Sequence, residues 1–157
     1  MLDRAEPAVA GTEVLVRPGI VAGTEVMTLR GPMPVEALEP GMRVITRSGA
    51  LALRAVERRV ERFARLVRVS ESALGPDRPE ADMHLAAGQP ILIRDWRAPA
   101  MTGDKRAMVP AWRMADGEYI RNEAARDTEI VTLIFDTAAI VYAGGLELGC
   151  DEVRGEA

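Results

Sequence analysis

The stretch "GIVAGTEVMTLRGPMPVEALEPGMRVITRSG" runs from Gly19 to Gly49 and alternates short strand patterns with turn signals. Glu25–Arg30 is rich in β-favouring residues and ends at a Gly-Pro turn. Pro34–Leu38 fits one helical turn, because proline is tolerated at the start of a helix. Met42–Arg47 alternates like a half-buried strand and meets a hairpin-type turn at Ser48 and Gly49. This order of strand, turn, helical turn and strand predicts a β-rich domain.

The hexapeptide VAGTEV occurs twice, at Val9–Val14 and at Val21–Val26. Only the second copy leads into the strand and turn pattern, so it is predicted to open the domain. One six-residue repeat does not make a repeat architecture. The first copy is therefore interpreted as chance or as part of an N-terminal leader, residues 1–18. An extra edge strand is the alternative.

The segment Leu53–Val67 allows two interpretations. Its apolar residues recur at alternating steps of three and four, which is the spacing of an amphipathic helix, whereas its end alternates as a strand does. Its arginines are interrupted by Glu57 and Glu61, which favours a solvated face over a nucleic-acid-binding stripe.

The remaining chain reads as short strands between turns. Two Trp residues, Trp96 and Trp112, are expected in the core, and an exposed Trp would instead indicate a binding surface. Short strands with turns at about 8–12-residue spacing indicate an all-β fold with few short helices. The predicted segments are a loop at Glu71–Asp82, two strands in Met83–Trp96, a loop at Arg97–Lys105, a short helix at Val109–Gly117, and strands at Glu129–Asp136 and Ala139–Leu148.

Composition excludes several classes of function. A net charge of −4 gives no general attraction to nucleic acid or to an anionic membrane. No apolar run approaches the ~20 residues of a spanning helix, and no signal peptide is recognisable, so a soluble cytoplasmic protein is expected. One His and one Cys cannot supply a typical zinc site, and glycine-rich phosphate loops are missing. No metal and no cofactor are therefore predicted.

Several pieces of the chain together resemble the Hint domain, the self-processing module of hedgehog proteins and inteins. The opening pieces are Gly23-Thr24, Val35–Leu38, Gly41 and Val44. Later pieces resemble the bacterial branch of this family in the same order, and they are Leu66–Gly75, Asp82–Ile93, Met108–Ile120 and Thr132–Leu148. The resemblance implies a Hint-like β-fold over residues 19–150, followed by a tail, residues 151–157. It also implies that Leu53–Val67 forms strands with a turn near Glu61–Ala64.

The family reaction starts when a Cys or Ser at the first domain residue attacks the preceding carbonyl, while a His in a Thr/Ser-x-x-His motif protonates the leaving nitrogen. By the resemblance, the nucleophile position falls on Gly19 or Ile20, and neither has a nucleophilic side chain. The motif falls on Ala86 and Gln89, and a Gln amide cannot act as an acid at useful pH. A further family His would fall near Ala138. The resemblance therefore implies a retained fold with degenerate catalytic motifs.

Two ways of keeping a function remain. His84 could form a relocated catalytic pair with Cys150 or Thr24. However, His84 lies five residues before Gln89 and would face the other side of an uninterrupted strand. Alternatively, Thr24, His84 and Gln89 could line the old cleft and bind a peptide without reacting.

We therefore expect a non-enzymatic peptide- or protein-interaction module. The alternatives are an active self-processing domain with a relocated nucleophile, and an assembly protein that oligomerises through its strand edges. Neither a nucleic acid nor a membrane is an expected partner.

Overall fold

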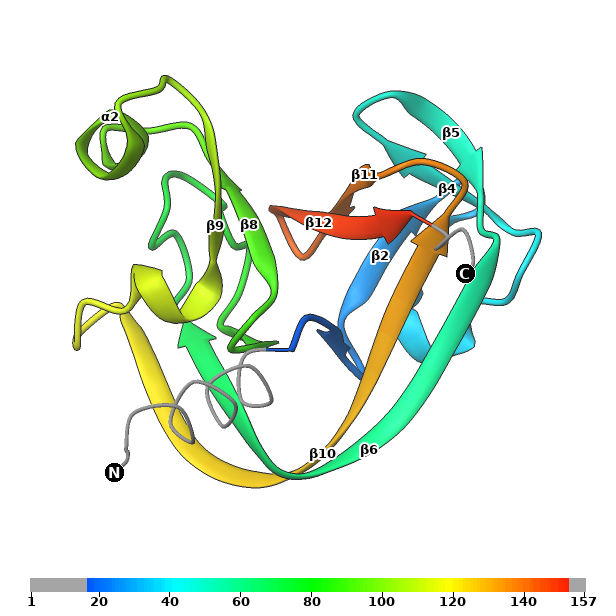
Figure 1. Ribbon diagram of the computed structural model, residues 1–157, viewed down its shortest axis with the longest axis horizontal. Coiled ribbons are helices and arrows are strands. Elements are labelled where there is room, and N and C mark those ends of the chain that lie inside the picture. The colour runs from blue at the N-terminus through cyan, green and yellow to red at the C-terminus, as the bar shows by residue number, and fades with distance from the viewer. Residues whose placement is uncertain (1–16, 153–157) are drawn as a thin grey trace, which may run out of the picture.

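The computed structural model describes residues 17–152, except for the side chains of residues 124, 125, 151 and 152. Strands dominate this part of the chain (Figure 1), which confirms the predicted all-β fold. The strands are β1 (Ile20–Val21), β2 (Glu25–Thr28), β3 (Gly31–Pro34), β4 (Arg43–Thr46), β5 (Gly49–Ala52), β6 (Ala55–Val69), β7 (Met83–Ala86), β8 (Pro90–Ile93), β9 (Ala107–Pro110), β10 (Ile120–Phe135), β11 (Ala139–Ala143) and β12 (Leu146–Glu152). The short helices are η1 (Val35–Ala37), α2 (Arg97–Thr102) and η2 (Ala111–Met114).

Two long antiparallel strands, β6 and β10, form the frame of the molecule. They pair from Ala55↔Ile134 to Val69↔Ile120 and curve together beneath the other elements (Figure 1). On one side of the curve lie β8, β9 and α2, and on the other lie β2, β4, β5 and β11, with β12 between the two groups. The frame therefore joins both halves of the molecule.

The β6 strand settles the ambiguous segment in favour of strand. The helical interpretation of its periodicity is wrong, because two of the apolar residues that make up the stripe, Val60 and Phe63, are 69% and 66% exposed and face no core. The expected turn near Glu61–Ala64 is instead a bend within one strand. Phe63 has a positive φ of 55°, and the register with β10 shifts on either side of Arg126.

The strands predicted at Glu25–Arg30 and Met42–Arg47 are present as β2 and β4, and the turn predicted at Ser48 and Gly49 closes a hairpin, whereas strand β3 was not predicted. The β2–β3 and β4–β5 hairpins pair in register, and η1 supplies the single helical turn between them. Thr28 and Thr46 close the two turns in the same way, since each hydroxyl donates to a glycine carbonyl at 2.7 Å. The first VAGTEV copy lies outside the described residues.

Three predictions need correction. Arg97–Lys105 is not a loop throughout, because Asp95 accepts the Arg97 amide hydrogen bond and starts α2. The helix predicted at Val109–Gly117 is only the short η2, because the preceding residues pair with β8 as strand β9. Trp96 and Trp112 are not core residues, since they are 71% and 43% exposed.

The core is aliphatic and continuous through both halves. Of the large aromatic side chains only Phe135 belongs to it, at 1% exposure. One end of the sheet order is β3, whose four residues include Pro32 and Pro34. In residues 17–152 no helix has the length and apolar composition needed to cross a bilayer.

Candidate functional site

The peptide bond between Pro18 and Gly19 is held from both sides. The Gly19 amide donates to Gln89 Oε1 at 3.0 Å, and the Pro18 carbonyl accepts from Arg59 Nη2 at 2.9 Å. The β1 strand follows at once and pairs with β10 through Ile20↔Val131. Sequence-distant elements therefore converge on the junction that opens the domain.

Arg59 is itself fixed by two further side chains of the frame. Its Nη2 and Nε lie 3.1 and 3.3 Å from Glu61 Oε1, and its Nη1 donates to Thr132 Oγ1 at 3.1 Å. These contacts therefore hold the Arg59 guanidinium in place against the Pro18 carbonyl. Sequence reasoning missed this role, because the only available signal was one arginine among several on a long strand.

Gln89 uses its whole amide to hold the junction. The side chain is 2% exposed, its Oε1 accepts from Gly19, and its Nε2 donates to the carbonyls of Pro90 and Gly149 at 3.0 and 2.8 Å. Ala86, three residues earlier, is buried in a small apolar cluster beside Ile130. Gln89 therefore cross-links three backbone segments instead of facing solvent.

There is no room for a side chain at residue 19. Gly19 has φ of +152°, and a Cβ built on it would come within 2.2 Å of Ile130 Cγ2. The adjoining cavity measures about 10 Å³ and is lined by Pro18, Gln89 and Cys150, among others. Such a volume holds at most about one water molecule, so a substrate does not fit there.

The structure divides the predicted cleft residues between two places. Thr24 and His84 line one open groove of about 420 Å³, whereas Gln89 lies in the enclosed cavity at the junction. His84 Nε2 is 3.0 Å from Glu123 Oε1, and its side chain is 29% exposed. Ala138 lies in an exposed turn between β10 and β11. Among residues 17–152 no three His, Cys, Asp or Glu side chains gather as a metal site would require.

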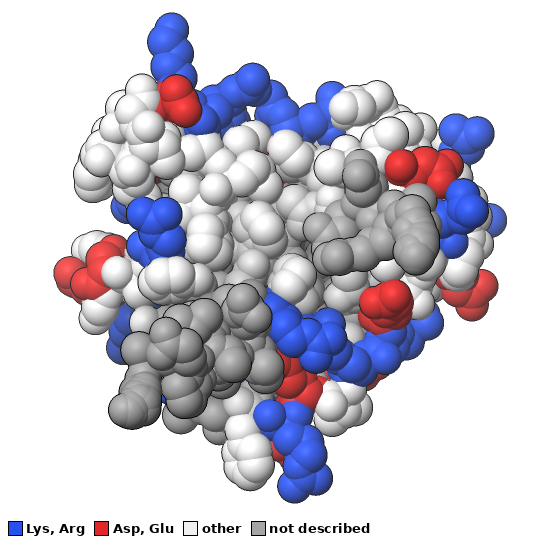
Figure 2. All heavy atoms as spheres, in the orientation of Figure 1, with Lys and Arg blue, Asp and Glu red and all other residues white. Residues whose placement is uncertain are grey.

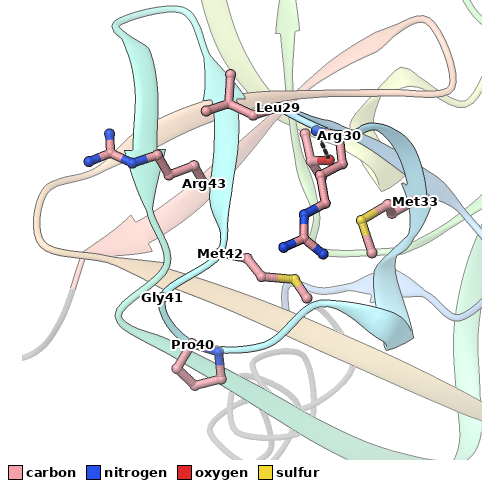
Figure 3. A pocket seen from close by; sticks show the side chains of 8 residues that line it. Leu29, Arg30, Met33, Pro40, Gly41, Met42 and Arg43 are labelled. Atoms are coloured by element: carbon pink, nitrogen blue, oxygen red, sulfur yellow. Dashed lines mark hydrogen bonds between the residues drawn. The ribbon is translucent and has the colours of Figure 1, made fainter.

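A further pocket of about 360 Å³ lies between the two N-terminal hairpins. Figure 3 shows Arg30 pointing toward Met33 and Met42, while Arg43 points away from them. None of the predicted site residues lines this pocket.

The second polar centre of the molecule is Glu147, which the sequence analysis missed. Its side chain is 5% exposed and bonds three guanidinium groups, from Arg47 at 2.5 Å, Arg78 at 3.1 Å and Arg94 at 2.8 Å. Burial by itself raises the pKa of the Glu147 carboxyl, but hydrogen bonds and positive charges from the arginines outweigh burial and hold the pKa below its usual range. The sequence feature that could have indicated a buried ion pair is the position of Glu147 between two leucines, in Leu146–Leu148.

The fold defines a class of β-domain built on two long curved strands. Gly19, at the Pro18–Gly19 junction, is buried beside these strands. The family model of the Hint domain matches residues 18–149. The chain therefore belongs to the Hint domain family. No curated protein matches it.

Solved structures of the same class are similar in fold. The bacterial intein-like domain from Clostridium thermocellum matches with a TM-score of 0.63 at 15% identity, covering 85% of this chain and 98% of that one. The MchDnaB-1 intein matches with a TM-score of 0.56 at 10% identity, over 83% and 98%. The gp41-1 intein matches with a TM-score of 0.55 at 9% identity, over 85% and 98%. At these identities the likeness concerns the fold alone.

Replacing Gln89 by leucine tests how far the junction depends on this one amide. The substitution leaves the Gly19 amide and the Pro90 and Gly149 carbonyls without their buried partner, and each costs about 1–3 kcal/mol. We expect the free energy of unfolding to fall by at least about 3 kcal/mol in denaturant titrations, the lower limit for three unpaired groups. A fall below about 1 kcal/mol would contradict the conclusion that Gln89 cross-links these backbone segments. Thr24→Val serves as the control, because the Thr24 side chain lines an open groove.

Proposed function

We propose that this Hint domain holds its Pro18–Gly19 junction without cleaving it and acts as a non-catalytic peptide- or protein-interaction module. The observation that carries the proposal is the hydrogen bond from the Gly19 amide to Gln89 Oε1. An acyl shift requires a nucleophile at the junction and an acid for the departing nitrogen. Here residue 19 has no side chain, and the group facing its nitrogen accepts a hydrogen bond.

The surroundings of the junction support the same conclusion. The contact between residue 19 and Ile130 leaves no space for a side chain, and the cavity of about 10 Å³ admits little water for hydrolysis. Surfaces that would be accessible to a partner lie elsewhere. The groove with Thr24 and His84 measures about 420 Å³, and two Trp side chains are exposed.

Self-processing with a relocated nucleophile is the second candidate, and two observations favour it. Arg59 donates to the Pro18 carbonyl, where a donor would stabilise a developing oxyanion, and Cys150 lines the same cavity. In that reaction the Cys150 sulfur would bond to the Pro18 carbonyl carbon as the bond to the Gly19 nitrogen breaks. The nitrogen would need a proton, and Gln89 Oε1 has none to give. The first proposal is therefore preferred.

Intact mass spectrometry decides between the two candidates. The purified full-length chain is incubated for several days at neutral pH, with and without hydroxylamine or a thiol, both of which trap an ester or thioester. We expect an unchanged mass in all samples, because no acyl shift occurs. Fragments separated after Pro18 would refute the proposal. Their loss in Cys150→Ala would then assign the nucleophile.

A further inference from the structure

Three arginines surround one carboxylate, that of Glu147 at the start of β12. Arg47 comes from the β4–β5 turn, Arg78 from the loop before β7, and Arg94 from the end of β8, and all three bond Glu147. One carboxylate neutralises only one of three guanidinium groups, so the cluster keeps an excess of two positive charges. Figure 2 shows a row of basic side chains along the top of the face that it presents.

An apolar pocket adjoins the arginine cluster. Arg78 and Arg94 line it together with Leu74, Pro76 and Ile93, and its volume is about 280 Å³. Arg94 is 44% exposed and bonds Glu147 through Nε, which leaves its two terminal nitrogens without a hydrogen-bond partner among the described residues. Those N–H groups are available to an anion.

The acidic residue in the pocket lining does not cancel this charge. Asp95 accepts from the Arg97 backbone amide at 2.9 Å and from the Arg97 guanidinium at 2.5 Å, so it has its own cation. Trp96, the next residue, is 71% exposed, with the Arg97 guanidinium 4.9 Å from its ring centroid. Trp96 thus follows a pocket-lining residue in the sequence, and Trp and Arg are residue types that dominate protein interfaces.

We propose that this surface, formed by Arg78, Arg94, Trp96 and the adjoining pocket, binds an acidic segment of another polypeptide that also carries an apolar side chain. The carboxylates bond the arginines, and the apolar side chain enters the pocket against Leu74 and Ile93. This inference rests on the proposed interaction function and names the chemistry of the partner. A peptide fits better than a nucleic acid, because the pocket wall is aliphatic and the whole chain carries a net charge of −4.

Fluorescence anisotropy with a fluorescein-labelled peptide of alternating Glu and Leu tests the proposal on the full chain. A Lys-Leu peptide and a labelled oligo-dT are the comparison probes. We expect binding of the Glu-Leu peptide only, weakened about tenfold in Arg94→Gln through loss of a charge-assisted hydrogen bond. Trp96→Ala should weaken it similarly, and Trp96 has no part in the Glu147 ion pairs. Arg30→Gln is the matched control, because Arg30 also lines an apolar pocket.

Each contrary result overturns the proposal. These results are no binding of the Glu-Leu peptide, unchanged binding in both Arg94→Gln and Trp96→Ala, equal loss in Arg30→Gln, or tighter binding of oligo-dT. Thermal unfolding of each variant, followed by circular dichroism, separates lost binding from lost folding. Failure here leaves the intact-mass result unchanged, so it is distinguishable from failure of the non-cleaving function.

Discussion

Glu147→Gln should lower the free energy of unfolding by about 2–4 kcal/mol, because removing the charge of a buried ion pair leaves its partners uncompensated. The side chain of Glu147 is 5% exposed and Arg78 is 19% exposed, so solvent screens this pair poorly. Arg47 and Arg94 are 32% and 44% exposed, so water can hydrate them when the carboxylate is removed. The loss in free energy of unfolding is therefore smaller than for a fully buried pair. Urea titration followed by circular dichroism measures the change.

Asp136→Asn provides the matched comparison. Asp136 pairs with Arg54 at 2.8 Å, but the two side chains are 73% and 60% exposed. Exposed pairs of this kind contribute about 0–1 kcal/mol, so this variant should keep nearly full stability. Equal losses in the two variants would show that Glu147 is an ordinary surface ion pair.

The same carboxylate makes the stability of the fold depend on pH. The pKa of Glu147 is lower in the folded state than in the unfolded chain, so its contribution is present in full above the unfolded value, about 4.5. The contribution is lost as pH falls from that value through the folded pKa. The stability difference between the native chain and Glu147→Gln should therefore be constant near neutrality and shrink in acid. A difference that grows in acid would contradict this assignment.

Scission at the junction should return only when three residues change together. Gly19→Cys supplies a nucleophile and Gln89→His supplies an acid for the leaving nitrogen. A Cβ at residue 19 nevertheless meets Ile130 Cγ2 at 2.2 Å, so Ile130→Ala is needed to make room. We expect intact mass spectrometry to show cleavage before residue 19 in the triple variant with hydroxylamine, and an unchanged mass in the Gly19→Cys, Gln89→His double variant.

The control for this experiment is Ile130→Ala alone. It should lose about 2–5 kcal/mol of stability, because Ile130 is fully buried, and should remain uncleaved. Cleavage in the double variant would show that Ile130 is no obstacle. An inert triple variant that folds, as judged by its circular dichroism spectrum, would contradict the assignment of residues 19 and 89 to the family positions.

The local patterns of the sequence predicted the regular parts of the fold. Strands β2 and β4 and the turn at Ser48 and Gly49 follow from alternation and turn residues, because both signals act within a few residues. The helical periodicity of Leu53–Val67 gave a wrong prediction, since β10 pairs with most of this segment from Ala55 onward and decides its conformation. The start of α2 depended on one Asp95 hydrogen bond, which composition does not reveal.

The site could be predicted only in part, for a related reason. The resemblance to Hint domains predicts the family positions at Gly19 or Ile20 and at Gln89, and a hydrogen bond joins Gly19 to Gln89 in the structure. Arg59 touches the Pro18 carbonyl across 41 residues of sequence, and Arg47 reaches Glu147 across 100. Contacts at such separations follow from the tertiary path of the chain, and a single sequence carries no periodic signal for them.

The two prolines of β3 have a consequence for how molecules of this protein meet one another. A proline nitrogen carries no hydrogen, so Pro32 and Pro34 offer a neighbouring strand acceptors but no donors. A strand of another molecule that approached this edge of the sheet would form fewer backbone hydrogen bonds than at an edge without proline. We therefore expect that concentrated solutions of this protein do not form fibrils through β3, because the two prolines disfavour edge-to-edge pairing between identical chains.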